Sequence, residues 1–92
     1  MGVMHLVSRA DILGTCLARA GESDAILLLS DGVYAGTLSD LTGWAAPPRL
    51  FVLVEDLRLR GISPASLCAG WTQLDYPAFV RLTVEYNPIV TW

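Results

Sequence analysis

Five consecutive apolar residues at positions 25–29 form the most informative part of the hydrophobic pattern. Asp24 precedes them, and Ser30, Asp31 and Gly32 follow. A strand with one wet face would alternate apolar and polar residues, so this run predicts a strand buried on both faces, as in the middle of a parallel sheet. Asp31 and Gly32 end the strand at the edge where open α/β sheets place ligands and partners. We therefore look for function first at that edge.

Four further segments have the composition of strands: residues 3–7, 49–54, 71–74 and 89–92. Helical patterns lie between them, so strand and helix alternate along the chain. This alternation predicts right-handed crossovers between parallel strands. We expect a small three-layer α/β domain that spans residues 1–92, with a mostly parallel sheet of about five strands.

The first helix is expected directly after the first strand, where Ser8 and Asp11 have the spacing of a capping box. Gly21 is expected to end it. Apolar residues between these limits recur at helical spacing, and they predict a stripe that faces the sheet. The stripe consists of Ile12, Leu13, Cys16, Leu17 and Ala20.

Turn formers and prolines set the next boundaries. Residues 33–43 predict a short helix or an irregular crossover, with Leu38 and Leu41 pointing inward. The sequence Ala-Ala-Pro-Pro at 45–48 predicts a linker, because proline cannot continue a helix and restricts the residue before it. Asp56 is expected to cap the turn that follows it.

Two later helix starts combine a capping residue with a nearby proline. Ser63 is expected to open a short helix through residue 68, and Asp75 a longer amphipathic helix. Arg81 and Glu85 are expected to lie on the wetter side of the longer helix, at the spacing of a side-chain pair. Its apolar stripe is expected to carry Phe79, Val80, Leu82, Thr83 and Tyr86.

The composition predicts assembly with other subunits. The chain has 92 residues, of which 53% are hydrophobic and 16% charged, against about 25% charged in an average soluble domain. A chain of this size buries only about 60 to 70% of its unfolded surface. We therefore expect a large apolar patch to be covered by other subunits.

The charge and the hydropathy pattern exclude other kinds of partner. A net charge of −3 argues against direct binding to nucleic acid, which needs clustered cations. No apolar run approaches the ~18 residues of a membrane span, and residues 1–6 lack the features of a secretion signal. We expect a cytoplasmic protein that does not contact a membrane. Cys16 and Cys68 are then expected to be reduced thiols.

Common catalytic and cofactor motifs are missing from the sequence. The turn at residues 7–9 lacks the glycines of a phosphate-binding loop, and no serine sits in a Gly-x-Ser-x-Gly elbow. His5 has no second histidine or nearby cysteine, so a buried, hydrogen-bonded structural histidine is favoured over a metal ligand. No cofactor and no metal are expected. The acids at strand exits could line a common rim, but each is favoured as a cap or turn former: Asp31, Glu55, Asp56 and Asp75.

Cys16 is the one plausible covalent group. A thiol near a helix start is acidified by the helix dipole, and Arg9 or Arg19 could assist. Its position on the apolar stripe, however, favours a small core residue. Cys68 is expected to pack in the core or at an interface.

Five blocks carry a resemblance to a known family. They are residues 4–9 (MHLVSR), 24–35 (DAILLLSDGVYA), 53–62 (LVEDLRLRGI), 75–85 (DYPAFVRLTVE) and the final Trp92. Their order and spacing resemble the TusB/DsrH family of sulfur-relay proteins, nearly from end to end.

The resemblance implies a DsrE-like (flavodoxin-like) fold and a place in a heterohexamer with TusC/DsrF-like and TusD/DsrE-like subunits. In the Tus form, persulfide sulfur passes through such a complex to a TusE/DsrC-like acceptor and on to 2-thiolation of a tRNA wobble uridine. In the Dsr form, the complex serves sulfur oxidation. The main acceptor cysteine belongs to the TusD or DsrE subunit, so this chain resembles an accessory partner.

Cys16 aligns with a helix cysteine of DsrH proteins, and the resemblance implies a secondary persulfide carrier there, whereas Cys68 has no counterpart. Two alternatives stay open. One is a stand-alone persulfide carrier or sulfurtransferase that uses Cys16. The other is a homo-oligomeric α/β module without a sulfur role. The sequence also leaves open the choice between tRNA thiolation and sulfur oxidation.

Overall fold

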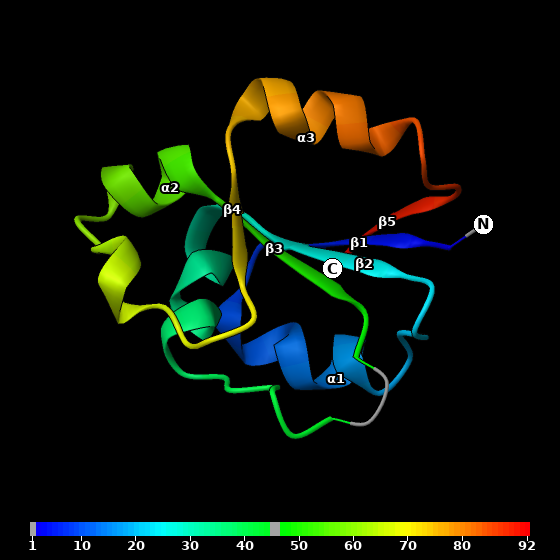
Figure 1. Cartoon of the computed structure of the whole chain (residues 1–92), viewed down its shortest axis with the longest axis horizontal. Coiled ribbons are helices and arrows are strands. Elements are labelled where there is room, and N and C mark those ends of the chain that lie inside the picture. The colour runs from blue at the N-terminus through cyan, green and yellow to red at the C-terminus, as the bar shows by residue number, and fades with distance from the viewer. Residues whose placement is uncertain (1, 45–46) are drawn as a thin grey trace.

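A computed structural model describes residues 2–44 and 47–92, and five strands in these ranges form one sheet (Figure 1). Every neighbouring pair is parallel, in the order β4-β3-β2-β1-β5. The predicted α/β fold with about five mostly parallel strands is thus confirmed. The strands are β1 (Met4–Val7), β2 (Ala25–Leu28), β3 (Arg49–Leu53), β4 (Thr72–Leu74) and β5 (Ile89–Thr91).

The central strand is β2, and all four of its residues are buried. Ile26 and Leu28 belong to the core on one face of the sheet, and Ala25 and Leu27 to the core on the other. This alternation is what a strand with two covered faces requires. The prediction made from the unbroken apolar run is confirmed.

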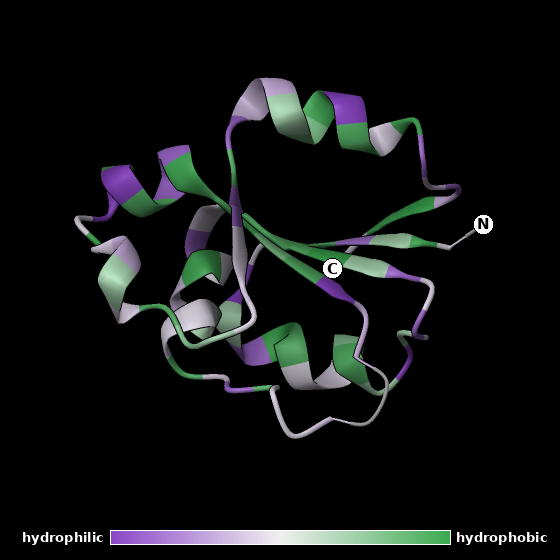
Figure 2. Cartoon of the chain, in the orientation of Figure 1, coloured by the Kyte–Doolittle hydropathy of each residue, from purple (hydrophilic) through white to green (hydrophobic). Residues whose placement is uncertain are grey.

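Helices cover both faces, which gives the predicted three layers (Figure 1). The larger core cluster lies under α1 (Leu13–Leu17), the 3₁₀ helix η2 (Ser30–Thr37) and α2 (Val54–Leu59). The smaller cluster lies under α3 (Tyr76–Thr83) on the opposite face. Figure 2 shows the apolar residues concentrated where the strands cross between these layers. Among the helices of the described ranges, none combines the length and apolar character that a membrane crossing requires.

Two of the predicted caps are present. The Asp75 carboxylate accepts a hydrogen bond from the backbone N–H of Ala78 at 2.9 Å and starts α3. The Ser63 hydroxyl accepts one from Ala65 at 3.3 Å and starts the 3₁₀ turn η3 (Pro64–Ser66), which is shorter than predicted. Both signals are local, since the capping side chain and the backbone N–H that donates to it lie within three residues.

The capping box predicted at Ser8 and Asp11 is wrong. The first helical turn, η1 (Ala10–Ile12), follows Arg9 and has no side-chain cap. The Ser8 hydroxyl instead donates to the backbone carbonyl of Trp92 at 2.9 Å, because β5 lies beside β1 in the sheet. A contact between residues 84 positions apart replaces the local one.

Two predicted inward side chains point outward. Leu38 follows η2 and is 78% exposed, whereas Leu41 is buried as predicted. Val80 is 63% exposed, because the face of α3 toward the sheet is taken by Leu82 and its neighbours three and four residues away. The predicted stripe of this helix was therefore drawn too wide.

Of two polar predictions, the one for Asp56 is wrong. Asp56 lies inside α2, which begins after Leu53, so it does not cap the turn that follows it. Arg81 and Glu85 are both exposed, as predicted for the wetter side of the last helix, and Glu85 lies 3.9 Å from the guanidinium of Arg49. The linker predicted at 45–48 lies partly outside the described residues, and Pro47 and Pro48 belong to no helix or strand.

Candidate functional site

The Cys16 thiol lies in the core between α1 and the sheet, with an exposed fraction of 0%. Leu13 and Leu17 of the same helix are buried beside it, as the apolar stripe predicts. Burial, and then the negative charge of Asp24, raise the pKa of Cys16 from 9.0 to about 11. The thiol is therefore protonated near neutral pH and out of reach of a reactant in this conformation. Persulfide carriage by Cys16 stays a prediction.

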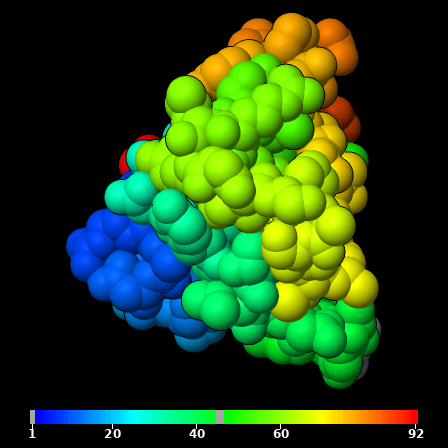
Figure 3. All heavy atoms as spheres, turned by 90° about the vertical axis from the view of Figure 1, so that its left-hand side faces the viewer, coloured from blue at the N-terminus to red at the C-terminus, as the bar shows by residue number. Residues whose placement is uncertain are grey.

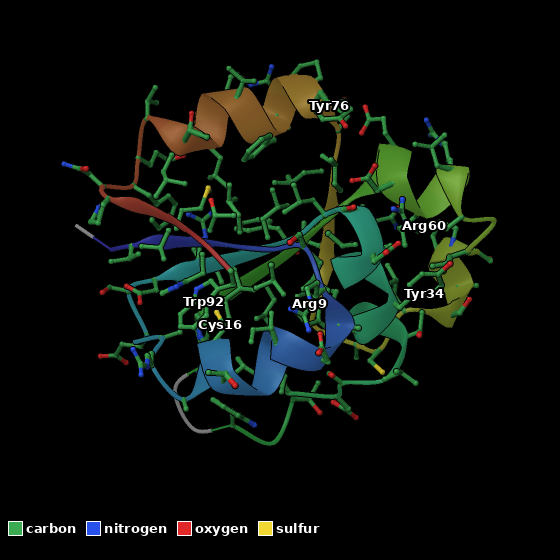
Figure 4. All side chains as sticks on the ribbon, turned by 180° about the vertical axis from the view of Figure 1, so that it is seen from behind. Arg9, Cys16, Tyr34, Arg60, Tyr76 and Trp92 are labelled. Carbon is green, nitrogen blue, oxygen red and sulfur yellow. The ribbon has the colours of Figure 1, made fainter. Side chains whose placement is uncertain are left out.

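Neither arginine that could assist Cys16 does so. Arg9 pairs with Asp11 at the exposed start of η1. Arg19 lies over the ring of Trp92, 6.0 Å from its centroid. Figure 4 shows Trp92 and Cys16 in the same layer, between the sheet and α1. The thiol thus has an aromatic neighbour and an acidic neighbour instead of a basic partner.

His5 is buried in β1 and hydrogen-bonded on both ring nitrogens, as predicted for a structural histidine. Its Nδ1 lies 3.0 Å from Nε1 of Trp92, and its Nε2 lies 3.0 Å from Oδ2 of Asp24. An indole N–H only donates, so Nδ1 must accept. The ring proton therefore sits on Nε2 and is donated to Asp24.

Asp24 joins the starts of two neighbouring strands. Its carboxylate accepts hydrogen bonds from the backbone N–H groups of Val3 at 2.9 Å and Gly21 at 3.0 Å, in addition to His5. Burial alone would raise the pKa of Asp24, but the bonds from Gly21, His5 and Val3 outweigh it and lower the pKa below 3.8. The sequence analysis missed this cluster of hydrogen bonds around Asp24. An acid directly before a buried strand indicates such a cluster only when the register of β1 and β2 is known.

The carboxyl edge of the sheet, the side of the molecule that faces the viewer in Figure 3, carries a second polar group. Ser30 leaves β2 with a φ of 53°, in the left-handed region that non-glycine residues rarely adopt. Its backbone N–H donates to Oδ2 of Asp56 at 2.6 Å. Arg60 donates to Oδ1 of Asp31 at 2.9 Å, to the Ser30 hydroxyl and to the Asp56 carbonyl. Two of the four predicted rim acids are thus brought together by one arginine.

The other two rim acids, Glu55 and Asp75, accept hydrogen bonds from backbone N–H groups in the first turn of α3. Glu55 accepts a hydrogen bond through Oε2 from the backbone N–H of Tyr76 at 3.1 Å, and Asp75 is the cap of the helix. The second oxygen of Glu55, Oε1, is buried without a hydrogen-bond partner in the described structure. Asp56, Glu55 and Asp75 each accept a hydrogen bond from a backbone N–H at a turn or helix start, whereas Asp31 accepts one from the Arg60 side chain. Within residues 2–44 and 47–92, no three His, Cys, Asp or Glu side chains gather closely enough to hold a metal ion.

A pocket of about 400 Å³ lies at the amino ends of β3 and β4, away from the predicted edge. Leu41, Leu50 and Phe51 make much of its lining apolar. Arg49 supplies a cation there: its guanidinium lies 5.1 Å from the centroid of the Phe51 ring and donates to the Tyr86 hydroxyl at 2.8 Å. Neither Cys16 nor Cys68 belongs to the lining, so this pocket presents no thiol.

Several of the exposed large apolar side chains lie on helices. Tyr76, Val80 and Val84 recur every four residues along α3 and form a stripe that faces away from the sheet, here called the α3 stripe. Tyr34 and Leu59 are exposed on η2 and α2. Exposed apolar side chains that lie on one face favour an interaction surface over chance exposure.

Comparison with known proteins gives one consistent relationship. The family of DsrH like proteins matches residues 7–89. Protein TusB of Escherichia coli (strain SMS-3-5 / SECEC) is 34% identical, over 98% of this chain and 100% of the relative. Protein TusB of Shigella boydii serotype 18 is 33% identical with the same coverage. The chain therefore belongs to the TusB/DsrH family, and this membership supports a role as a subunit of a sulfur-relay system.

Proposed function

We propose that this chain is an accessory subunit of a cytoplasmic sulfur-relay complex of the TusBCD or DsrEFH type. Similarity to TusB along nearly the whole chain carries the proposal. Its partners are TusC/DsrF-like and TusD/DsrE-like subunits in a heterohexamer. The complex hands persulfide sulfur to a TusE/DsrC-like acceptor, toward 2-thiolation of a tRNA wobble uridine.

The chemistry of the thiols supports an accessory role. Sulfur transfer requires a thiolate that attacks the outer sulfur of a donor persulfide. Cys16 is buried, and its pKa is raised to about 11, so it does not supply that thiolate in the free chain. Cys68 is half-buried and has no counterpart in the family resemblance. In the proposed complex the reactive cysteine belongs to a partner subunit, as that resemblance implies, and this chain contributes a surface.

The α3 stripe is the surface that best suits a partner. One eight-residue helix covers the smaller core cluster, and Val80 and Val84 are exposed on its outer side. Fully burying a side chain such as valine contributes about 1.5 to 3 kcal/mol. A partner of the same fold would gain part of this contribution from each residue of the stripe, since Tyr76 and Val80 are already partly buried.

Coexpression with TusC-like and TusD-like chains tests the proposal. We expect one complex on size exclusion with light scattering, and we expect Val80→Glu with Val84→Glu to weaken it while the circular dichroism spectrum is unchanged. Arg81→Gln is the matched control, since Arg81 is exposed on the same helix outside the stripe. A chain that stays monomeric and ignores both partners contradicts the proposal.

A secondary persulfide carrier at Cys16 is the second candidate, favoured by the alignment of this cysteine with the DsrH helix cysteine. In that step the Cys16 thiolate bonds to the outer sulfur, and the donor leaves as a thiolate. Mass spectrometry after incubation with a persulfide donor tests it with and without partner subunits, with Cys16→Ser as control. Gain of one sulfur atom without partners supports a stand-alone carrier. A sulfite-reductase gene cluster beside this gene would support sulfur oxidation instead of tRNA thiolation.

A further inference from the structure

Three side chains form a directed chain of hydrogen bonds under the sheet. The Trp92 indole donates to Nδ1 of His5, and Nε2 of His5 donates to Asp24. The Asp24 carboxylate is also held by the backbone N–H groups of Val3 and Gly21. Each ring nitrogen of His5 therefore has one partner. The Trp92 indole can only donate a hydrogen bond, and the Asp24 carboxylate can only accept one.

A proton added to His5 can enter only at Nδ1, because Nε2 already carries one. The imidazolium would then present an N–H to the N–H of Trp92, which lies 3.0 Å away and cannot accept. The bond to Asp24 would gain the attraction of a full positive charge. Protonation thus favours the contact with Asp24 and removes the contact with Trp92.

The backbone of Trp92 is held at the edge of the sheet. It follows β5, an edge strand of three exposed residues that pairs only with β1 within the described sheet. Its backbone N–H donates to the Leu6 carbonyl at 2.8 Å, and its carbonyl accepts from Ser8. Short edge strands open locally at low cost in free energy.

The indole of Trp92 packs against the larger core cluster, which contains Cys16 (Figure 4). The charged and titratable groups around the ring pair of His5 and Trp92 are Asp24 at the start of β2, and Cys16 and Arg19 on and just after α1. Arg19 lies over the indole ring, 6.0 Å from its centroid. The partly buried indole is thus one of the side chains that cover the layer in which the thiol lies.

We propose that His5 and Trp92 form a proton-operated latch, in which protonation of His5 at Nδ1 releases the indole and opens access to Cys16. The latch is independent of the proposed function, because it follows from the donor and acceptor character of the three side chains and from the packing of the indole against the core cluster that contains Cys16. Through the latch, the reactivity of the buried Cys16 thiol depends on the protonation of His5 as well as on the protonation of the thiol itself.

Indole ¹⁵N–¹H NMR of the full chain tests the latch during an acid titration. We expect the Nε1 resonance of Trp92 to shift with the same midpoint as the His5 ring signals. Trp71 is the internal control, since its indole donates to the Ser39 carbonyl, which does not titrate. In His5→Gln the Trp92 shift should be absent, and Trp92→Phe assigns the resonance.

Alkylation gives a second readout. The alkylation rate of Cys16 is divided by the alkylation rate of Cys68. In this ratio the common effect of pH on thiolate formation cancels. We expect this ratio to rise about fivefold on protonation of His5, the factor that loss of one net hydrogen bond allows, and to stay constant in His5→Gln. Three results overturn the latch: a Trp92 resonance that stays in place while His5 takes up its proton, a shift that persists in His5→Gln, or unfolding before His5 is protonated.

Discussion

Ser30 and Asp56 hold the exit of the central strand in an uncommon conformation. Ser30 has a φ of 53°, and its backbone N–H donates to the Asp56 carboxylate at 2.6 Å. A non-glycine residue in this region costs about 1 to 2 kcal/mol, so the carboxylate is needed to retain it. Two segments that are 26 residues apart thereby fix the edge where β2 meets η2.

Replacement of Asp56 by alanine should destabilise the protein by about 1 to 3 kcal/mol, because the Ser30 N–H loses its acceptor. Asp56→Asn should cost less, since the amide oxygen can still accept. The free energy of unfolding in urea measures both. Asp11→Ala is the matched control: its exposed pair with Arg9 contributes about 0 to 1 kcal/mol. Equal losses for Asp11→Ala and Asp56→Ala would contradict this assignment.

Gly32 should not tolerate a side chain. A Cβ at this position would lie 2.0 Å from the carbonyl oxygen of Val7, so the backbone of β1 or η2 would have to shift. We expect Gly32→Ala to cost about 3 kcal/mol or more, at the upper end of overpacking effects. Gly14→Ala is the control, because nothing lies within 4 Å of its Cβ in α1 and alanine favours the helix by about 1 kcal/mol. Opposite shifts of the melting temperature are expected, and a neutral Gly32→Ala would show that the two segments are not in close contact.

The sequence predicted features that depend on neighbours along the chain. The buried strand at 25–29, the cap at Asp75 and the stripe that contains Cys16 each follow from patterns of ten residues or fewer. Such patterns report burial and local hydrogen bonds directly. The order of the strands is not local, and it decides which polar groups meet.

Two of the contacts that sequence analysis missed join Trp92 to β1 and to Ser8, which follows it. Ser8 bonds to Trp92 rather than capping a helix, and His5 and Trp92 meet although 87 positions separate them. Both contacts exist because β5 returns beside β1, which no local pattern encodes. The prediction that Val80 points inward was wrong for a related reason. Helical spacing identifies an apolar stripe, but the packing of the helix against the sheet decides which residues of the stripe are buried.

Asp24 should make stability depend on acid pH. Its pKa is lower in the folded protein than the ordinary 3.8, so the unfolded chain takes up the proton first. The stabilisation is fully present above about pH 4 and is lost as pH falls through the folded pKa. Asp24→Asn should flatten the fall of the free energy of unfolding below pH 4, in urea titrations at several pH values. Asp11→Asn serves as control, and an unchanged slope in Asp24→Asn would contradict the role given to this carboxylate.

Cys16 should react slowly in the native protein. A pKa raised from 9.0 to about 11 lowers the thiolate fraction at pH 8 about a hundredfold relative to the unfolded chain. Burial of the sulfur slows the reaction further. We expect iodoacetamide to modify the half-buried Cys68 first, and Cys16 at a comparable rate only in denaturant, as peptide mass spectrometry would measure. The same raised pKa predicts stability that is present below pH 9 and lost as pH rises toward 11, an effect absent in Cys16→Ala. Native alkylation of Cys16 as fast as in denaturant would mean that the thiol is open to solvent, and the accessory role proposed for this subunit would then lose its chemical support.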